Sequence, residues 1–147
     1  MNDFDIPIFK KAYDLYKTFH DYRKVIPKHD RFTIFERSES ALLEVIECIM
    51  QASGEHKKEK LPTLERASFK LNMLRVYIRL MKDVKTIDGK KYMTLESSID
   101  EMGRMLGGWI RSVKVASTPN FIHPQTLVFQ HLRDSFSIQG GNGVATF

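Results

Sequence analysis

The sequence YMTLESSIDEMGRMLGGWIRSV, residues 92–113, carries apolar side chains at alternating steps of three and four residues. These positions are Tyr92, Leu95, Ile99, Met102, Leu106, Trp109 and Val113. Because residues three and four apart share one face of an α-helix, the spacing predicts a helix whose single apolar seam closes a helical bundle. Asp88-Gly89 predicts the preceding turn. We expect the helix to end near Val115, since Ser117-Thr118-Pro119-Asn120 breaks helical structure.

The segment before this turn predicts another helix, from near Pro62 to about Val84, with two apolar stripes. The first stripe has the same heptad spacing and comprises Leu64, Ala67, Leu71, Leu74, Ile78 and Met81. The second lies roughly 150° around the helix and comprises Phe69, Met73, Val76, Leu80 and Val84. One seam cannot bury both. The second stripe either packs on another helix of the same bundle or is an oligomer interface, for which Phe69, Met73, Val76 and Leu80 are the candidates.

Two more helices are predicted upstream. The first runs from about Ile6 to Lys24, and its inward face comprises Ile8, Ala12, Leu15, Phe19 and Tyr22. The next begins with a capping box, in which the Thr33 and Glu36 side chains each bond the other's backbone N–H, and it ends at Ser53-Gly54. Its inward stripe comprises Phe35, Leu42, Ile46 and Ile49. We expect residues 27–31 to be a connection and the charged run 55–60 to be a solvated loop.

Length and composition place these helices in one domain. With 147 residues and 42% hydrophobic content, the chain suits a single core of the all-α class. Residues 1–115 are expected to form the four-helix bundle, and residues 116–147 a tail that is loosely ordered or forms a short docking helix. No apolar run approaches the roughly 20 residues that span a bilayer, and the N-terminus lacks a signal peptide's cationic region, so a cytoplasmic location is expected. Cys48, the only cysteine, predicts an inert core thiol.

Positive charge is concentrated in one part of the chain. The net charge is +5, and in residues 60–115 Lys and Arg outnumber Asp and Glu by 12 to 6. Such asymmetry is typical of proteins that bind nucleic acid or an acidic protein surface, although it also occurs on well-solvated surfaces. The candidate binding residues are Arg75, Arg79 and Lys82 on one helix face, Arg104 and Arg111 on the last helix, and Lys90 and Lys91 at the turn. Lys28 and Arg31 are weaker candidates, because they can fix the loop between the first two helices.

The chain offers no pattern typical of catalysis or of a metal site. The five histidines fall in different segments, and none has a second His or Cys at metal-ligand spacing. The carboxylates Glu44 and Glu47, and Glu96, Asp100 and Glu101, lack the Glu-x-x-His partners of a di-iron bundle, so surface ion pairing is expected. Gly103 and Gly107, one turn apart, predict a close contact between helices. We therefore expect no enzyme activity, cofactor, metal or small-molecule substrate.

Four motifs in order resemble one known family. They are Tyr13-Asp14-Leu15-Tyr16, Ile26-Pro27-Lys28-His29-Asp30-Arg31-Phe32, Leu71-Asn72-Met73-Leu74-Arg75 with Arg79-Leu80, and Gly103-Arg104-Met105-Leu106-Gly107-Gly108-Trp109-Ile110. Over roughly residues 7–115 the chain resembles the accessory variability determinant (Avd) proteins of diversity-generating retroelements. The last motif is the most specific of the four, and the tail beyond Ala116 does not match the pattern.

The resemblance implies an antiparallel up-and-down four-helix bundle that assembles as a homopentameric barrel with a basic surface. It also implies that the protein partners the retroelement's reverse transcriptase and its template RNA during error-prone cDNA synthesis, without an active site of its own. Two alternatives remain at this stage. One is an RNA-associated protein of the related four-helix family encoded in intervening sequences of ribosomal RNA, and the other is a structural helical oligomer that binds no nucleic acid. The sequence specifies neither the RNA recognised nor which basic residues contact it.

Overall fold

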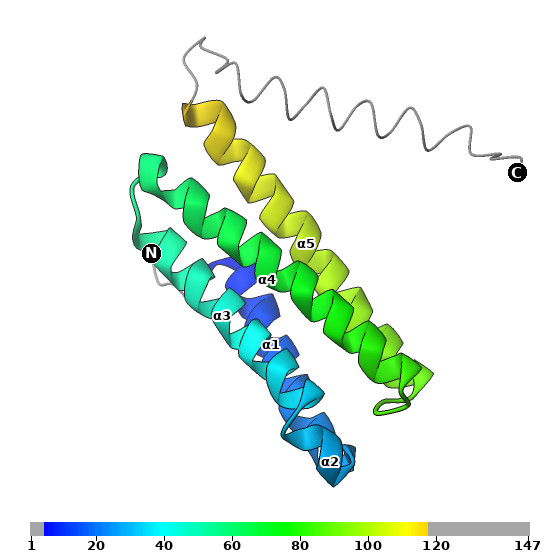
Figure 1. Ribbon diagram of the computed structural model, residues 1–147. Coiled ribbons are helices and arrows are strands. Elements are labelled where there is room, and N and C mark those ends of the chain that lie inside the picture. Colours follow the sequence, from blue (N-terminus) through cyan, green and yellow to red (C-terminus); the bar gives the residue numbers. More distant parts are fainter. Residues whose placement is uncertain (1–4, 118–147) are drawn as a thin grey trace, which may run out of the picture. The chain divides into compact units, whose positions relative to one another are not determined.

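A computed structural model describes residues 5–117, and within this part the chain is all-α, with four long helices and no strand. The long helices are α1 (Pro7–Tyr22), α3 (Ile34–Gly54), α4 (Lys57–Asp83) and α5 (Gly89–Ser117). They lie side by side, with α3 against α4, α4 against α5, and α1 against both α3 and α5 (Figure 1). No helix of this part is long and apolar enough to cross a membrane. The predicted tail, from residue 118 onward, lies outside the described residues.

The two heptad seams form the centre of the core, as predicted. All six residues of the first α4 stripe are buried, and so are Tyr92, Leu95, Ile99, Met102, Leu106 and Val113 of the α5 seam. Trp109, the remaining seam residue, is partly buried and packs against this core. Because burial of apolar surface is the main favourable term in folding, these seams hold α4 and α5 together.

The inward faces of α1 and α3 complete the core. Ile8, Ala12, Leu15 and Phe19 are buried on α1, with Phe9 as an additional core residue that the spacing did not predict. On α3 the buried residues include Phe35, Leu42 and Ile49, whereas Ile46 is only partly buried. The Phe19 and Phe35 ring centroids lie 5.7 Å apart, within the range of a favourable aromatic pair.

The predicted connection between the first two long helices contains helical turns of its own. A 3₁₀ turn, η2 (Arg23–Val25), is followed by a short helix, α2 (Lys28–Arg31). Arg31 donates hydrogen bonds to the carbonyl oxygens of Ile26 (2.8 Å) and Lys24 (3.3 Å), so it fixes this loop as its position suggested. The Thr86 hydroxyl donates to Asp30 Oδ2 (2.7 Å), which ties α2 to the loop between α4 and α5.

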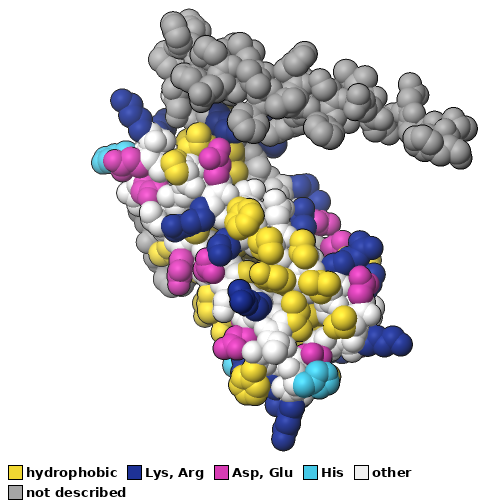
Figure 2. Space-filling view, viewed as in Figure 1, with side chains coloured by type: hydrophobic (Ala, Val, Ile, Leu, Met, Phe, Trp, Pro, Cys, Tyr) yellow, Lys and Arg dark blue, Asp and Glu magenta, His cyan; other side chains and the backbone are white. Residues whose placement is uncertain are grey.

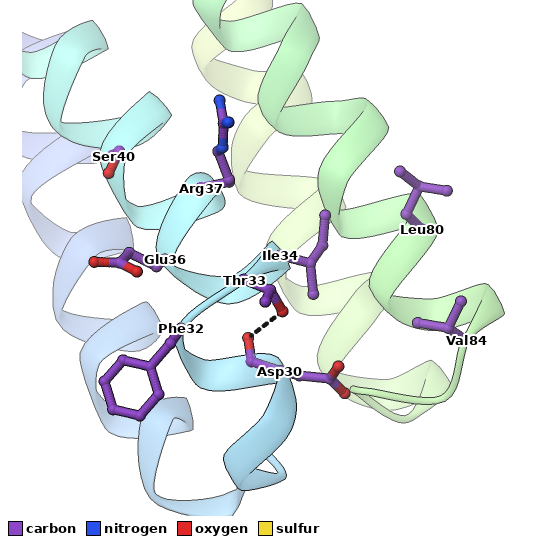
Figure 3. A pocket seen from close by; sticks show the side chains of 9 residues that line it. All are labelled: Asp30, Phe32, Thr33, Ile34, Glu36, Arg37, Ser40, Leu80 and Val84. Carbon is purple, nitrogen blue, oxygen red and sulfur yellow. Dashed lines mark hydrogen bonds between the residues drawn. The ribbon is translucent and has the colours of Figure 1, made fainter.

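The predicted capping box at the start of α3 is wrong. Thr33 is the residue before the helix, but its side chain makes no capping hydrogen bond. Its hydroxyl donates instead to the carbonyl oxygen of His29 (3.2 Å) and to that of Asp30 (3.4 Å), and Figure 3 shows the second of these bonds. The unexpected helix α2 supplies these acceptors three and four residues back, and a Thr33 side chain turned toward them does not place its oxygen to accept from the Glu36 N–H, as a cap requires.

The charged run before Pro62 is not a solvated loop, because α4 begins within it at Lys57. The His56 carbonyl accepts from the N–H groups of Glu59 (2.9 Å) and Lys60 (3.1 Å), which starts the helix. Pro62 lies in the second turn of α4. It lacks the N–H that would bond to the carbonyl oxygen four residues earlier, and that carbonyl lies in the first turn, near the exposed start of the helix. Glu55 Oε1 accepts from the hydroxyl of Thr63 (3.0 Å) and thereby joins the end of α3 to α4.

The predicted turn at Asp88-Gly89 is wrong, because the turn lies at Val84-Lys85 and Gly89 is already the first residue of α5, with Asp88 directly before it. Asp88 Oδ1 accepts a hydrogen bond of 2.8 Å from the Lys91 backbone N–H, in the manner of a helix N-cap. This backbone hydrogen bond, together with the Lys91 ammonium, lowers the pKa of Asp88 below its usual value. The carboxylate form is therefore the one that caps α5.

Candidate nucleic-acid interface

A groove of about 510 Å³ runs between α4 and α5 and contains three of the predicted basic residues. Arg75 contributes from α4, and Arg104 and Arg111 contribute from α5. The same groove is lined by Ser68, Asn72, Asp100, Gly103 and Gly107. Arg104 and Arg111 are exposed, and neither makes a hydrogen bond or ion pair with another residue of the described range 5–117.

Arg75 is held in place within the groove. Its Nη2 lies 3.1 Å from Asp100 Oδ1, which joins α4 to α5 by an ion pair. Its Nε is shielded from solvent and has no hydrogen-bond acceptor in the described residues. The role of Asp100 in orienting Arg75 was not predicted, because the sequence indicated only a general surface ion pair.

The two glycines of the groove accommodate guanidinium groups. A Cβ atom added at Gly103 would lie only 2.6 Å from Arg75 Nη2, closer than real Cβ contacts allow. A Cβ atom at Gly107 would meet only Arg111 Nη1, at 3.6 Å. The predicted close contact between helices is therefore confirmed at Gly103, which side-chain atoms of Arg75 and Leu71 on α4 approach. It is wrong at Gly107, whose neighbour within 4 Å belongs to α5 itself.

A second hollow, of about 360 Å³, continues from Arg75 along the same two helices. Arg79 on α4 and Tyr92 and Glu96 on α5 line it. Burial, and then the hydrogen bond and negative charge of Glu96, raise the pKa of Tyr92 above its usual value, so the phenol stays neutral at physiological pH. Lys82 Nζ lies 4.5 Å from the centroid of the Tyr92 ring, a cation–π contact.

Five of the seven predicted basic residues therefore border one band along α4 and α5. We call Arg75, Arg79, Lys82, Arg104 and Arg111 the basic band. Within this band, Asp83 compensates the positive charge of Arg79 only weakly, because Arg79 Nε lies 4.0 Å from Asp83 Oδ2 and both side chains are mostly exposed.

Lys90 and Lys91 are placed differently, at the start of α5 beside the turn. Lys91 Nζ lies 2.9 Å from Asp88 Oδ2 and 5.8 Å from the Tyr22 ring centroid, so it already has local partners. Lys90 is exposed. The structure does not group these two lysines with the lining residues of the two hollows.

Several carboxylates that resembled a metal-binding set form ion pairs with nearby cations. Glu44 pairs with Lys70 (2.8 Å), and Glu101 pairs with Lys11 (2.5 Å). The predicted ion pairing is confirmed for these residues, as it is for Asp100. Within residues 5–117, no group of three or more His, Cys, Asp or Glu side chains is placed to hold a metal ion.

The second apolar stripe of α4 is exposed along the described part of the chain. Phe69, Val76, Leu80 and Val84 have exposed fractions of 60%, 50%, 44% and 62%, and Met73 is partly buried. Figure 2 shows hydrophobic side chains gathered over α4, with Lys and Arg side chains beside them. Among the helices of residues 5–117, none covers this stripe, so the alternative that another helix of the same bundle buries it is wrong for this part.

The stripe ends in a groove of about 880 Å³ between the start of α3 and the end of α4. Ile34 lies on the α3 side of this groove and Leu80 and Val84 on the α4 side (Figure 3). Arg37 and Glu36 line its α3 wall. An apolar ridge that runs into a groove is a surface suited to binding another protein.

Comparison with known proteins identifies the family. A search among curated proteins finds no match. The family model described as bAvd-like matches residues 7–113, which include all four long helices apart from the last turn of α5 and all residues of the basic band. The resemblance to Avd proteins is thereby confirmed, and the chain belongs to the bAvd-like family.

Proposed function

We propose that this protein is a non-catalytic accessory protein of a diversity-generating retroelement, which binds the reverse transcriptase and the template RNA and supports mutagenic cDNA synthesis. Its membership of the bAvd-like family supports the accessory role. The observation that carries the binding function is the basic band along α4 and α5, in which Arg104 and Arg111 lack protein partners among the described residues.

The chemistry of the band fits a phosphate-bearing partner. Guanidinium groups are always charged, and their planar fork matches phosphate oxygens in two hydrogen bonds. A cation without a protein counter-charge has no ion pair to give up when it binds an anionic ligand, and each phosphate that it neutralises releases counterions of the nucleic acid. RNA held in this way is bound strongly at low salt and with little dependence on base sequence, as suits an accessory protein that serves one template at many positions.

We further propose that the four helices form an antiparallel up-and-down bundle and that copies of it assemble into a ring, a homopentameric barrel as in the family the chain resembles. The short connections between successive long helices support the up-and-down course. The exposed α4 stripe supports assembly, since a neighbouring subunit would remove Phe69, Val76 and Leu80 from water. The groove beside Ile34 would take an apolar side chain from that neighbour.

The assembly is tested by the substitution Val76→Asp. A charge placed in a contact that excludes water is strongly unfavourable, so we expect the oligomer's dissociation constant to rise tenfold or more. Sedimentation velocity over a range of protein concentrations measures this change. The control is Val25→Asp, the same substitution at a 62% exposed position before α2, which should leave assembly intact.

Two outcomes would contradict the interface. If Val76→Asp assembles like the unchanged protein, the α4 stripe lies outside the contact between subunits. If it loses its helical circular-dichroism signal while Val25→Asp keeps it, the stripe contributes to the fold itself.

The accessory function is tested by affinity purification of the tagged protein from its native cells at low salt, with identification of the retained proteins and RNA. Recovery of a reverse transcriptase together with one discrete template RNA is the expected result. Ribosomal RNA alone would favour a protein of the intervening-sequence type. Recovery of neither polymerase nor RNA would favour a structural oligomer.

A further inference from the structure

The geometry points to the groove between Arg75 and Arg111 as the binding site of a single-stranded RNA backbone, whose successive phosphodiester groups contact the guanidinium groups that lie against Gly103 and Gly107. This inference rests on the proposed function and deepens it, because it names the chemical group bound and the residues that admit it. It assigns the two glycines a role in access to the groove.

Glycine in the middle of a helix requires a reason, because it favours helix formation much less than alanine does. Gly103 and Gly107 lie well inside α5, and neither meets a backbone atom of α4 in close contact. What their missing Cβ atoms provide is space: for the Arg75 guanidinium at Gly103, and for an open groove beside Arg111 at Gly107. A ligand can therefore approach α5 closely between the arginines.

Arg75 is oriented before any ligand arrives. Asp100 holds Nη2 at 3.1 Å, and the guanidinium lies against Gly103, so the side chain has little rotational freedom left to lose on binding. The shielded Nε–H has no acceptor among the described residues. Because this nitrogen is shielded from water, a ligand in the groove contacts the exposed part of the Arg75 side chain, 41% of its surface, while Asp100 holds the guanidinium in place.

The spacing of the arginines favours a phosphate chain over a single carboxylate. Arg104 and Arg111 are seven residues apart on one helix, which corresponds to roughly 10 Å at 1.5 Å per residue. One carboxylate cannot contact both, whereas a nucleic-acid strand offers a charged group at every nucleotide. Ser68 and Asn72 add neutral donors to the same groove, of the kind that commonly contact phosphate oxygens.

Two glycine substitutions test this RNA-binding site without removing any charge. Gly103→Ala places a methyl group 2.6 Å from the present position of Arg75 Nη2, so the guanidinium must move, and Gly107→Leu fills the groove beside Arg111. Both new residues favour helix more than glycine does, so loss of the fold is not the expected consequence. The control is Gly89→Ala, because a Cβ atom there meets nothing within 4 Å.

Binding is measured by fluorescence anisotropy with a labelled oligouridylate of about 12 nucleotides. The loss of one phosphate contact corresponds to about a fivefold higher Kd at 0.1 M salt, and to a shallower salt dependence, so we expect at least this change for Gly103→Ala and for Gly107→Leu. Gly89→Ala should bind like the unchanged protein. Circular dichroism verifies that all variants retain their helices.

The other outcomes overturn the inference. If both glycine variants bind RNA normally while charge reversal of Arg75, Arg104 and Arg111 weakens binding, the proposed function stands, but the RNA backbone does not bind in the groove beside the two glycines. If RNA binding is normal but capture of the reverse transcriptase is lost, the groove receives an acidic protein segment instead. If the unchanged protein does not bind the oligonucleotide at all, RNA binding itself fails as part of the proposed function.

Discussion

The triple substitution Arg75→Glu, Arg104→Glu and Arg111→Glu should raise the Kd for single-stranded RNA about a hundredfold at 0.1 M salt. Each phosphate contact with a single strand contributes about 0.7 to the slope of log K against log salt. Three lost contacts therefore correspond to about a hundredfold at that salt concentration, and the slope should become shallower by about 2. Anisotropy titrations at several salt concentrations measure both quantities.

A matched control separates the groove from the protein's overall charge. Lys10→Glu, Lys24→Glu and Lys57→Glu together change the net charge by the same amount at three exposed positions outside the groove. This control should lose only the long-range part of the attraction, which salt screens. Equal losses for the two triple variants would mean that RNA responds to net charge alone, and the basic band would not be the interface.

The substitution Phe35→Ala should lower the free energy of unfolding by about 3–5 kcal/mol. Phe35 is 1% exposed, and its ring pairs with Phe19 on α1, so its removal leaves a cavity where α1 and α3 meet. A loss of this size is a large part of the roughly 5–15 kcal/mol that stabilises a typical domain. Urea unfolding followed by circular dichroism, at one fixed protein concentration, measures the change.

Phe32→Ala is the matched control for this prediction. Phe32 lies three residues earlier and is 69% exposed, with Arg23 above its ring at 5.9 Å as its aromatic contact. Its removal should change the free energy of unfolding by less than about 1 kcal/mol. Similar losses for the two variants would show that the region around residue 35 is less tightly packed than its burial indicates.

The long-range features of the fold could be predicted from apolar spacing because burial decides them. The first α4 stripe is buried at every predicted position, and the α5 seam is buried apart from the partly exposed Trp109. The second α4 stripe was also found by spacing, but spacing alone could not distinguish an internal contact from an external one. That distinction depends on where the other helices lie, which only the structure reveals.

Two predictions that the structure contradicts concern the starts of α3 and α4, where alternative short-range hydrogen bonds compete. Thr33 has the sequence of a capping residue, yet α2 offers its hydroxyl two carbonyl acceptors, which no local pattern revealed. The start of α4 was placed too late because Pro62 is usually a first-turn residue, and here the helix begins five residues before it. Such local choices differ in free energy by little, so neighbouring segments decide them.

The grouping of the candidate basic residues could be predicted only in part. The charge pattern identified the cations of the basic band, but it did not distinguish them from Lys91, which pairs with Asp88. The roles of Asp100 and Gly103 could not be read from the sequence, because they depend on the approach of α4 and α5 at Arg75. Whether the band binds RNA remains a prediction that the experiments above decide.

The buried thiol of Cys48 allows the rate of local opening in the fold to be measured by chemical labelling. Cys48 on α3 is 1% exposed, and Arg66 Nε on α4 lies 3.1 Å from its Sγ and donates to it. Because Cys48 is buried, a thiol reagent can react only after the packing around it opens, so the labelling rate at high reagent concentration equals the rate of that opening. Because the chain has one cysteine, the labelling signal has one source, and the rate of local opening can be measured without an engineered probe.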